Sequence, residues 1–444
     1  EQEGIDSYFR EMKHRAYLDS FYKLVKEREV KRAVVLMGPR RVGKTVMIHH
    51  AIQQLLDEGI DPKRICYISI DAPVYIGIGL EQLLLLYKEA AGLDSLEGCY
   101  VFFDEIQYLK LWEVHLKKLV DDYRDVKFIA SGSAAAALRM KSQESGAGRF
   151  TNYMLPPLSF YEFLHLRDID GAKLNYDDLN KEFIDYINFG GFPEAVFSEA
   201  IRGDMSRYIR SDIIDKVLLR DLPSLYGIHD VQELNRLFTM LAYNTGNEVS
   251  LDELSQGSGV AKNTIKKYLG YLEAAFLITV LHRVDQSGKR FKRANFFKVY
   301  LTNPSMRSAL FEPITNDSPE IGHLVETAFI TQWAHSFVLM KNIYYSRWNK
   351  GEVDFVQLDN EKIIRCIEIK WSNKYVAQPG KLKSLIKFAE RNNVPNIYVS
   401  TIDVSSEEPY GDLLIEYFPA SVLSYVAGEV IMNNIFEHKM LKIG

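Results

Sequence analysis

One short segment of the sequence combines glycine, lysine and threonine at a spacing suited to phosphate chemistry. It follows the apolar run AVVLM and reads GPRRVGKT. Its glycines let backbone N–H groups turn toward phosphate oxygens, the Lys44 amine reaches the β- and γ-phosphates, and the Thr45 hydroxyl ligates Mg²⁺. This is P-loop spacing, so we expect ATP and Mg²⁺ as cofactors. The expected nucleotide-binding residues are Gly38, Pro39, Arg40, Arg41, Val42, Gly43, Lys44, Thr45 and Val46.

Two carboxylates follow a second apolar run. The residues YVFF predict a buried strand, and Asp104 and Glu105 come directly after it. Ligands of parallel sheets bind at the C-terminal ends of the strands. We therefore expect Asp104 to hold Mg²⁺ and Glu105 to act as the general base that polarises the attacking water. The sequence thus predicts ATP hydrolysis as well as ATP binding, with Lys44 and Glu105 as catalytic residues.

Two serines and an arginine are further candidates near the γ-phosphate. The run KFIAS delivers Ser131 and Ser133, and a hydroxyl there would orient water; a plain serine turn is the alternative for Ser133. Arg149 would supply positive charge to the γ-phosphate of its own chain or of a neighbouring subunit in a homo-oligomer. A solvated arginine is the alternative for Arg149.

The C-terminal part of the chain carries a second constellation. Asp354 lies in GEVDF, Glu368 and Lys370 lie in CIEIK, and Glu326 lies on the preceding predicted helix. Strand alternation puts Glu368 and Lys370 on one face. The order Asp, then Glu-x-Lys, resembles the core of the restriction-endonuclease-like superfamily. Asp354 and Glu368 would bind Mg²⁺, Lys370 would steady the attacking hydroxide, and Glu326 would complete the metal shell. The alternatives are ordinary charged strand faces or an inherited fold whose chemistry has lapsed.

Residues 250–276 have the pattern of two short helices joined by a turn. SLDE is a capping box that begins a helix, SGVA is a turn, and NTIKKYLGYLEAAFLI is a second helical pattern. We interpret the segment as a helix-turn-helix whose second helix enters a DNA groove. The residues that would face DNA are Lys262, Asn263, Lys266 and Lys267.

The charge of this region favours DNA as a partner. Between Ser258 and Lys298 nine basic residues stand against Glu273 and Asp285, a local net charge of +7 in a chain of net charge −5. The segment SGKRFKR would form a basic wing for phosphates. The alternative is a winged helix that contacts only protein, because a fold does not determine a function. The basic residues are Lys262, Lys266, Lys267, Arg283, Lys289, Arg290, Lys292, Arg293 and Lys298.

The P-loop and the acidic pair require a parallel sheet to position them. A helical pattern over residues 5–30 precedes the strand run AVVLM, the helical pattern VMIHHAIQQLLDEG follows the loop, and the strand runs RICYISID, CYVFFDE and KFIASGS come next. Strand, loop, helix and strand in this order open a parallel α/β sheet. Residues 165–232 look mostly helical and are broken at NFGGFP, where glycine and proline predict a turn.

Composition sets the broad class. The chain has 444 residues, 47% hydrophobic and 25% charged, which predicts roughly three folded domains at about 150 residues each. No apolar run reaches the roughly 18 residues of a membrane span, so we expect a cytoplasmic protein without a membrane partner. Cys66, Cys99 and Cys366 lie in strand-like runs and predict reduced core thiols.

Several motifs together resemble one family. GPRRVGKT, FFDEIQ, IASGSA, GRF and LPPLSFYEF are similar to segments of the AAA+-related prokaryotic ATPases that carry a C-terminal domain of unknown function. The resemblance extends over nearly the whole chain. It implies an ATPase domain, a winged-helix region and a nuclease-like terminal domain, and it strengthens Arg149 as a finger or sensor residue.

The expected fold class is α/β. We predict a P-loop NTPase parallel sheet over residues 1–165, a helical lid over 166–232, a winged helix-turn-helix over 233–300 and a restriction-endonuclease-like domain over 301–444. The leading hypothesis is an ATP-driven protein that binds DNA and couples nucleotide state to a nuclease-like domain. The alternative is a nucleotide-controlled protein-interaction switch whose nuclease fold is catalytically silent.

Overall fold

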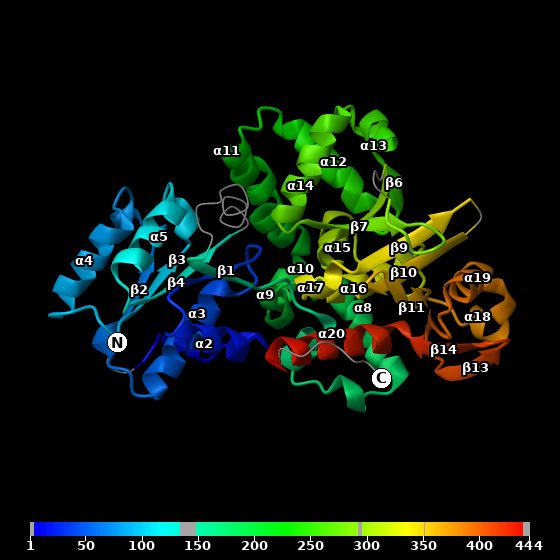
Figure 1. Ribbon diagram of the computed structural model, residues 1–444, viewed down its shortest axis with the longest axis horizontal. Coiled ribbons are helices and arrows are strands. Elements are labelled where there is room, and N and C mark those ends of the chain that lie inside the picture. Colours follow the sequence, from blue (N-terminus) through cyan, green and yellow to red (C-terminus); the bar gives the residue numbers. More distant parts are fainter. Residues whose placement is uncertain (1–3, 134–147, 292–294, 350, 438–444) are drawn as a thin grey trace. The chain divides into compact units, whose positions relative to one another are not determined.

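The computed structural model describes residues 4–133, 148–291, 295–349 and 351–437 of the chain. They belong to two compact units, residues 1–156 with 220–227 and residues 157–219 with 228–444. Each unit contains its own sheet (Figure 1). In the described part of the chain, no helix is long and apolar enough to cross a membrane. All three cysteines are buried and free, as predicted.

The first unit is built on a five-stranded sheet in the order β2-β3-β4-β1-β5. All of its strand pairs are parallel. Both faces of such a sheet are covered, which explains why β1, β3 and β4 are buried at every position. Four of these strands lie in the predicted runs, and the fifth strand was not predicted. The strands are β1 (Ala33–Met37), β2 (Ile65–Ser69), β3 (Tyr100–Asp104), β4 (Lys127–Gly132) and β5 (Phe150–Met154).

Helices cover both faces of this sheet, because each parallel crossover must pass over one face. Figure 1 shows α2 and α3 on one face and α4 and α5 on the other. The helix predicted over residues 5–30 is present as two short helices, α1 and α2. The helices are α1 (Ser7–Arg10), α2 (Leu18–Lys26), α3 (Lys44–Asp57), η1 (Pro62–Arg64), η2 (Pro73–Tyr75), α4 (Leu80–Ala90), η3 (Ile106–Tyr108), α5 (Trp112–Asp122) and α11 (Leu222–Tyr226).

The second unit begins with a helical region, as the sequence predicted. The predicted turn separates α8 from α9, which begins at Pro193. The predicted lid is not a compact unit by itself, because residues 157–219 belong with the rest of the second unit. The elements are α7 (Phe160–Leu166), η5 (Gly171–Lys173), α8 (Tyr176–Phe189), α9 (Pro193–Phe197), α10 (Glu199–Gly203) and the π-helical turns η6 (Ser206–Asp215) and η7 (Val217–Asp221), of which the last two residues belong to the first unit.

One nine-stranded sheet runs through the second unit, in the order β13-β14-β12-β11-β10-β9-β7-β8-β6. Strand β7 pairs in parallel with β9. The domain boundary predicted at residue 300 falls inside β8, so the two predicted C-terminal domains share a single sheet. The strands are β6 (Glu248–Ser250), β7 (Ile278–Val284), β8 (Phe296–Leu301), β9 (Ile343–Trp348), β10 (Gly351–Asp359), β11 (Lys362–Glu368), β12 (Asn396–Thr401), β13 (Ser406–Tyr410) and β14 (Leu413–Pro419).

The two helices and the turn predicted after residue 250 are present as α13 (Leu251–Ser258) and α14 (Lys262–Ala274), next to α12 (Val231–Tyr243). The predicted capping box begins α13: the Ser250 hydroxyl accepts from the Glu253 N–H, and the Glu253 carboxylate accepts from the Ser250 N–H. Gly259 ends α13 with φ +75°, a left-handed conformation that glycine adopts without steric cost.

Helices pack on both faces of the terminal part of this sheet. Apolar residues of α19 share a core with β10, β11 and β12. Phe329 and Trp333 of α16 pack against Phe355 of β10. The register of β10 against β9 shifts between Val353 and Val356, a β-bulge that re-aims the intervening side chains. The helices are α15 (Ser305–Leu310), α16 (Ile321–Trp333), α17 (Phe337–Met340), α18 (Lys374–Ala377), η8 (Pro379–Lys381), α19 (Lys383–Asn392) and α20 (Ala420–Glu437).

Candidate functional site

The P-loop lies between β1 and α3, where the sequence places it. Gly43 caps α3 with φ +92°, so its backbone needs the freedom of glycine. A Cβ atom on Gly38 would lie 2.1 Å from the carbonyl oxygen of Leu155. No side chain fits there without a shift of the backbone. The two glycines therefore allow the loop to fold tightly at the carboxyl end of β1.

Lys44 is folded back onto its own loop. Its Nζ donates to the carbonyl oxygens of Pro39 at 2.8 Å and Gly38 at 3.3 Å, and the residue is 5% exposed. Burial lowers the pKa of Lys44, while the carboxylates of Glu105 and Asp104 oppose this effect. The ammonium group is thus held at the loop by weak carbonyl acceptors that phosphate oxygens would replace.

Asp104 is the buried centre of the nucleotide site. Its Oδ2 accepts from the hydroxyls of Thr45 at 2.8 Å and Tyr67 at 2.9 Å. Its Oδ1 accepts from the Ser131 hydroxyl and from the Glu105 N–H at 3.1 Å. A carboxylate beside a threonine hydroxyl is the hard oxygen donor set that Mg²⁺ prefers, so these residues fit the predicted ion. Tyr67 was not predicted, and nothing in its strand run marks it.

Glu105 is held in an unusual conformation. Its φ is +53°, which costs energy in a residue other than glycine. Its N–H donates to Asp104 and to the Ser131 hydroxyl, and its carboxylate accepts from the Gln107 amide. The Gln107 Oε1 in turn accepts from the Ser133 N–H at 3.1 Å. Ser133 and Gln107 therefore position the Glu105 carboxylate, and the Ser133 hydroxyl is buried without a partner among the described residues.

Two residues that the sequence did not indicate hold the loop from distant parts of the chain. Arg15 donates to the carbonyl oxygens of Val42 at 2.6 Å and Pro156 at 3.0 Å. Asp221 accepts two hydrogen bonds of 3.2 Å from the Arg40 guanidinium. Burial tends to lower the pKa of Arg40, but Asp221 raises it overall. Arg40, a predicted nucleotide ligand, is therefore engaged by an ion pair across 181 positions of sequence.

Arg149 does not lie at the nucleotide site of its own chain. The adjoining Phe150 pairs with Ala33 at the start of β1, whereas the P-loop follows Met37 at the end of that strand. A strand rises by about 3.3 Å per residue, so the length of β1 separates them. Arg149 instead pairs with Asp121. Its predicted role within its own chain is wrong, and a role in a neighbouring subunit stays a prediction.

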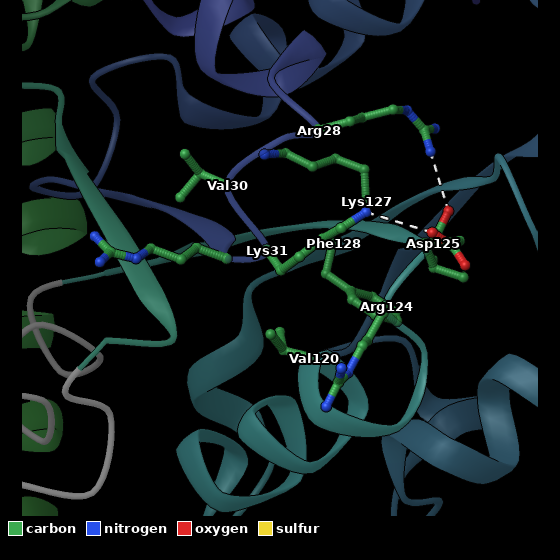
Figure 2. Close-up of a pocket in the computed structure, with 10 residues that line it drawn as sticks. Arg28, Val30, Lys31, Val120, Arg124, Asp125, Lys127 and Phe128 are labelled. Atoms are coloured by element: carbon green, nitrogen blue, oxygen red, sulfur yellow. Dashed lines mark hydrogen bonds and ion pairs between the residues drawn. The ribbon is translucent and has the colours of Figure 1, made fainter.

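A basic pocket opens at this same amino-terminal edge of the sheet (Figure 2). Arg28 donates to the backbone oxygen of Asp125, and Lys31 pairs with the Asp125 carboxylate. Lys127 donates to the backbone oxygen of Glu27, and burial lowers the pKa of Lys127 to about 8. These cationic side chains bind backbone and carboxylate oxygens near the strand ends, so a structural role accounts for the basic residues of the pocket.

The terminal sheet brings together three predicted residues. The Lys370 Nζ lies 2.9 Å from the Asp354 Oδ2 and 2.9 Å from the Glu368 Oε1. The Ile369 N–H also donates to the Asp354 Oδ2 at 2.9 Å. The second oxygen of Glu368, Oε2, is buried and has no hydrogen-bond partner in the described structure. The expected juxtaposition is present, and the catalytic and metal-binding roles stay predictions.

Glu326 approaches this cluster through Lys298, which the sequence placed in the basic region, and through Tyr300, which the sequence did not indicate. The Lys298 Nζ lies 2.7 Å from the Glu326 Oε1, 2.8 Å from the Glu352 Oε1 and 3.5 Å from the Asp354 Oδ1. The Tyr300 hydroxyl donates to the Glu326 Oε1 at 2.7 Å. No group of three or more His, Cys, Asp or Glu in the described residues is placed to hold a metal ion. The prediction that Glu326 completes a metal shell is wrong, because the Lys298 ammonium stands beside it instead.

The two carboxylates nearest Lys370 have opposite pKa shifts. Burial tends to raise the pKa of Asp354, but Lys370 and Lys298 hold it at about 2. Burial, and then the Asp354 charge, raise the pKa of Glu368 to about 8. Such divergence is expected where like charges share a small buried volume. Without a further cation the cluster keeps Asp354 ionised and favours a proton on Glu368.

The basic surface is smaller than the sequence predicted. The four residues expected on the second helix are exposed on α14, and Lys262 pairs with Asp252. Lys289 and Arg290 are exposed, and Lys292 and Arg293 lie outside the described residues. Lys298, which the sequence counts in the local positive charge, is 2% exposed and adds nothing to the basic surface. The alternation of β8 turns it toward the carboxylates of the terminal sheet.

Two parts of the chain match described families. Residues 30–164 match an AAA domain, and residues 180–318 match a domain of unknown function. The first match and the P-loop geometry together support an AAA-type, ATP-binding fold for this part of the chain. The match agrees with the sheet, the glycines and the acidic pair described above.

Two relatives of similar length are described only as uncharacterised proteins. A protein of Haemophilus influenzae is 26% identical over 74% of this chain and 80% of its own length, and one of Methanocaldococcus jannaschii is 26% identical over 84% and 82%. Solved structures include a RuvB mutant of Thermotoga maritima, at 18% identity, 60% and 88% coverage and a TM-score of 0.30. The Aeropyrum pernix Orc1 protein in complex with DNA has 11% identity, 69% and 94% coverage and a TM-score of 0.34. Scores this low carry no argument about this chain.

The packing of Gly38 yields a first prediction. Gly38→Ala should destabilise the first unit by about 1–3 kcal/mol and weaken nucleotide binding, because the new Cβ displaces the backbone at Leu155. Gly79→Ala is the matched control, since its Cβ would meet no atom closer than 4.0 Å. Thermal unfolding and binding of a fluorescent ATP analogue measure both effects. Equal behaviour of the two variants would contradict the steric account.

Proposed function

We propose that this chain hydrolyses ATP with Mg²⁺ in its first unit and, in its second unit, binds DNA beside a metal-dependent nuclease site. The observation that carries the second part is the convergence of Asp354, Glu368 and Lys370 at one end of the sheet. The first part is supported by the AAA match and by the buried Asp104 beside Thr45.

The roles in ATP hydrolysis follow from the contacts of each residue. Bound Mg²⁺ neutralises charge that develops on the phosphates. Thr45 and Asp104 would hold it, and Lys44 would move from its carbonyl acceptors to the phosphate oxygens. Glu105 would accept the proton of the attacking water while Gln107 fixes its carboxylate.

Substitution of the two central residues separates binding from hydrolysis. Lys44→Ala should abolish tight ATP binding, because it removes the charge that meets the β- and γ-phosphates. Glu105→Gln should leave ATP bound and slow hydrolysis by about a hundredfold or more, the effect of a lost general base. Equilibrium binding and steady-state phosphate release measure these effects, with exposed Glu89→Gln as control. Wild-type turnover in Glu105→Gln would show that another residue acts as the general base.

DNA binding is supported by the order of elements in the second unit. Helix α12, strand β6, helices α13 and α14 and the hairpin β7–β8 follow one another. β8 pairs with both β6 and β7. We interpret this order as a winged helix, in which the second helix of the turn would enter a DNA groove. The exposed Lys266 and Lys267 on α14 and Arg290 on the hairpin would contact phosphates.

The basic surface predicts a salt-sensitive interaction. Replacing Lys266, Lys267 and Arg290 with Ala should weaken DNA binding similarly for all sequences and flatten its salt dependence, because fewer counterions are released. Fluorescence anisotropy across a salt series measures this effect. Replacement of exposed Lys173 and Lys181 in the helical region is the control. Wild-type protein without salt-sensitive binding would favour a protein-interaction switch.

The proposal of phosphodiester hydrolysis is supported by the residue types in the terminal site. A divalent ion, when bound, lowers the pKa of its water and polarises the phosphate. Asp354 and the free oxygen of Glu368 would hold the ion, and Lys370 would stabilise the charge of the attacking hydroxide. In the leading hypothesis the nucleotide state of the first unit gates this site.

One observation favours the alternative of a silent nuclease fold in an interaction switch. Lys298 and Lys370 already neutralise part of the carboxylate cluster without any metal ion. A cluster satisfied by its own lysines is compatible with a purely structural role. Cleavage measurements decide between these functions.

Substitution in the terminal cluster tests the nuclease assignment. Asp354→Ala and Lys370→Ala should each abolish Mg²⁺-dependent DNA cleavage and leave ATP hydrolysis largely intact. Asp359→Ala is the control, since Asp359 is an exposed carboxylate on the same strand. Gel assays on single- and double-stranded DNA, with and without ATP, provide the measurement. Cleavage that survives both changes, or never occurs in the wild type, would rule this site out.

A further inference from the structure

The buried side chain of Lys298 places a positive charge beside the carboxylates of the terminal sheet. Lys298 comes from β8, Glu326 from α16, and Glu352 and Asp354 from β10. The Lys298 Nζ lies within 2.8 Å of two carboxylates and 3.5 Å from the third. Its side chain is 3% exposed, so its charge interacts with these groups rather than with solvent. Three elements thus converge on one ammonium group.

The net charge of the carboxylates and lysines in this cluster determines how many cations it can bind. With all four carboxylates ionised, as a bound cation would keep them, Glu326, Glu352, Asp354 and Glu368 supply four negative charges, and Lys298 and Lys370 supply two positive charges. The formal balance of −2 matches one divalent cation. Exposed Arg347 also approaches Glu352 at 3.5 Å, but it lies equally near Glu248 of the neighbouring network.

These contacts leave acceptor atoms on Asp354 and Glu368. Glu326 uses its Oε1 for both Lys298 and Tyr300. The Glu368 Oε2 has no hydrogen-bond partner in the described structure, and the Asp354 Oδ1 has only the 3.5 Å contact with Lys298. Asp354 and Glu368 can therefore supply ligand atoms for a metal ion, whereas a metal ion beside Glu326 would meet the positive charge of Lys298.

We infer that Lys298 is a built-in counter-ion that occupies the Glu326 side of the cluster and restricts the site to a single divalent cation held by Asp354 and Glu368. This inference rests on the metal site of the proposed function. Lys298 is a positioning residue, since it acts through the carboxylates. Its removal should open a second cation position between Glu326, Glu352 and Asp354, because three carboxylates would then lack their shared positive charge.

The number of bound Mn²⁺ ions tests this inference. Electron paramagnetic resonance counts Mn²⁺ per full-length chain without nucleotide, in an Asp104→Asn background that removes the carboxylate of the P-loop site. We expect one ion in this background, one with Lys298→Arg and two with Lys298→Met. The change Asp354→Asn with Glu368→Gln should remove the ion altogether. Circular dichroism verifies that each variant is folded.

A charge-matched pair covers the case in which Lys298→Met does not fold. Lys298→Met with Glu326→Gln removes one charge of each sign and keeps the balance at −2, so it should bind one ion. Glu326→Gln alone leaves −1 and should bind Mn²⁺ more weakly, on the order of tenfold or more. Equal affinity in these two variants overturns the counter-ion role.

The remaining outcomes separate this inference from the proposed function. A single ion in folded Lys298→Met, or two ions in the background protein, overturns the counter-ion inference and leaves the metal site standing. A background protein that binds no ion overturns the metal site and the inference with it. Two bound ions in Lys298→Met, together with one bound ion in Lys298→Arg, would support both the metal site and the counter-ion inference.

Discussion

The buried Lys298 ammonium is the interaction on which the second unit depends. Moving a charge out of water costs several kcal/mol, and the cost is offset only if partners surround the charge in good geometry. Glu326, Glu352 and Asp354 provide those partners, and Tyr300 donates to the same Glu326 oxygen. Loss of one partner of such a group typically costs about 3–5 kcal/mol. The hairpin strand β8, helix α16 and strand β10 must therefore fold as one unit.

The buried aspartates of the two candidate sites have different hydrogen-bond and charge partners. Asp104 accepts from the hydroxyls of Thr45, Tyr67 and Ser131, which are neutral donors that stabilise its charge without cancelling it. Asp354 instead faces two lysines. In the proposed ATPase site, the first arrangement would leave a full negative charge available to a cation that arrives with the nucleotide. The second arrangement has half of its formal carboxylate charge balanced by lysines, which in our proposal limits how many ions it would take.

Local patterns made part of this structure predictable. The P-loop, the strand ends at Asp104 and the set of Asp354, Glu368 and Lys370 follow from short spacings, because alternation and turn geometry act within a few residues. Contacts between residues far apart in the sequence could not be predicted, because no local pattern marks them. The ion pair of Asp221 with Arg40, across 181 positions, is an example. Arg149 was misplaced because a spacing does not say at which end of a strand a residue lies.

Few backbone pairs join the β7–β8 hairpin to β9 of the same sheet. Strand β7 pairs with β9 through Arg283 and Val284, and the Ser346 hydroxyl donates to the backbone oxygen of Val284 at 3.2 Å. Glu248 of β6 accepts from the Tyr345 hydroxyl of β9 at 2.7 Å and widens the contact. So few ladder bonds would leave the hairpin weakly attached, whereas the Lys298 cluster fixes it from the adjoining strand. A ligand that shifts the hairpin must therefore also shift the charge that faces Asp354, which makes β8 the physical link between the helix-turn-helix surface and the carboxylate site.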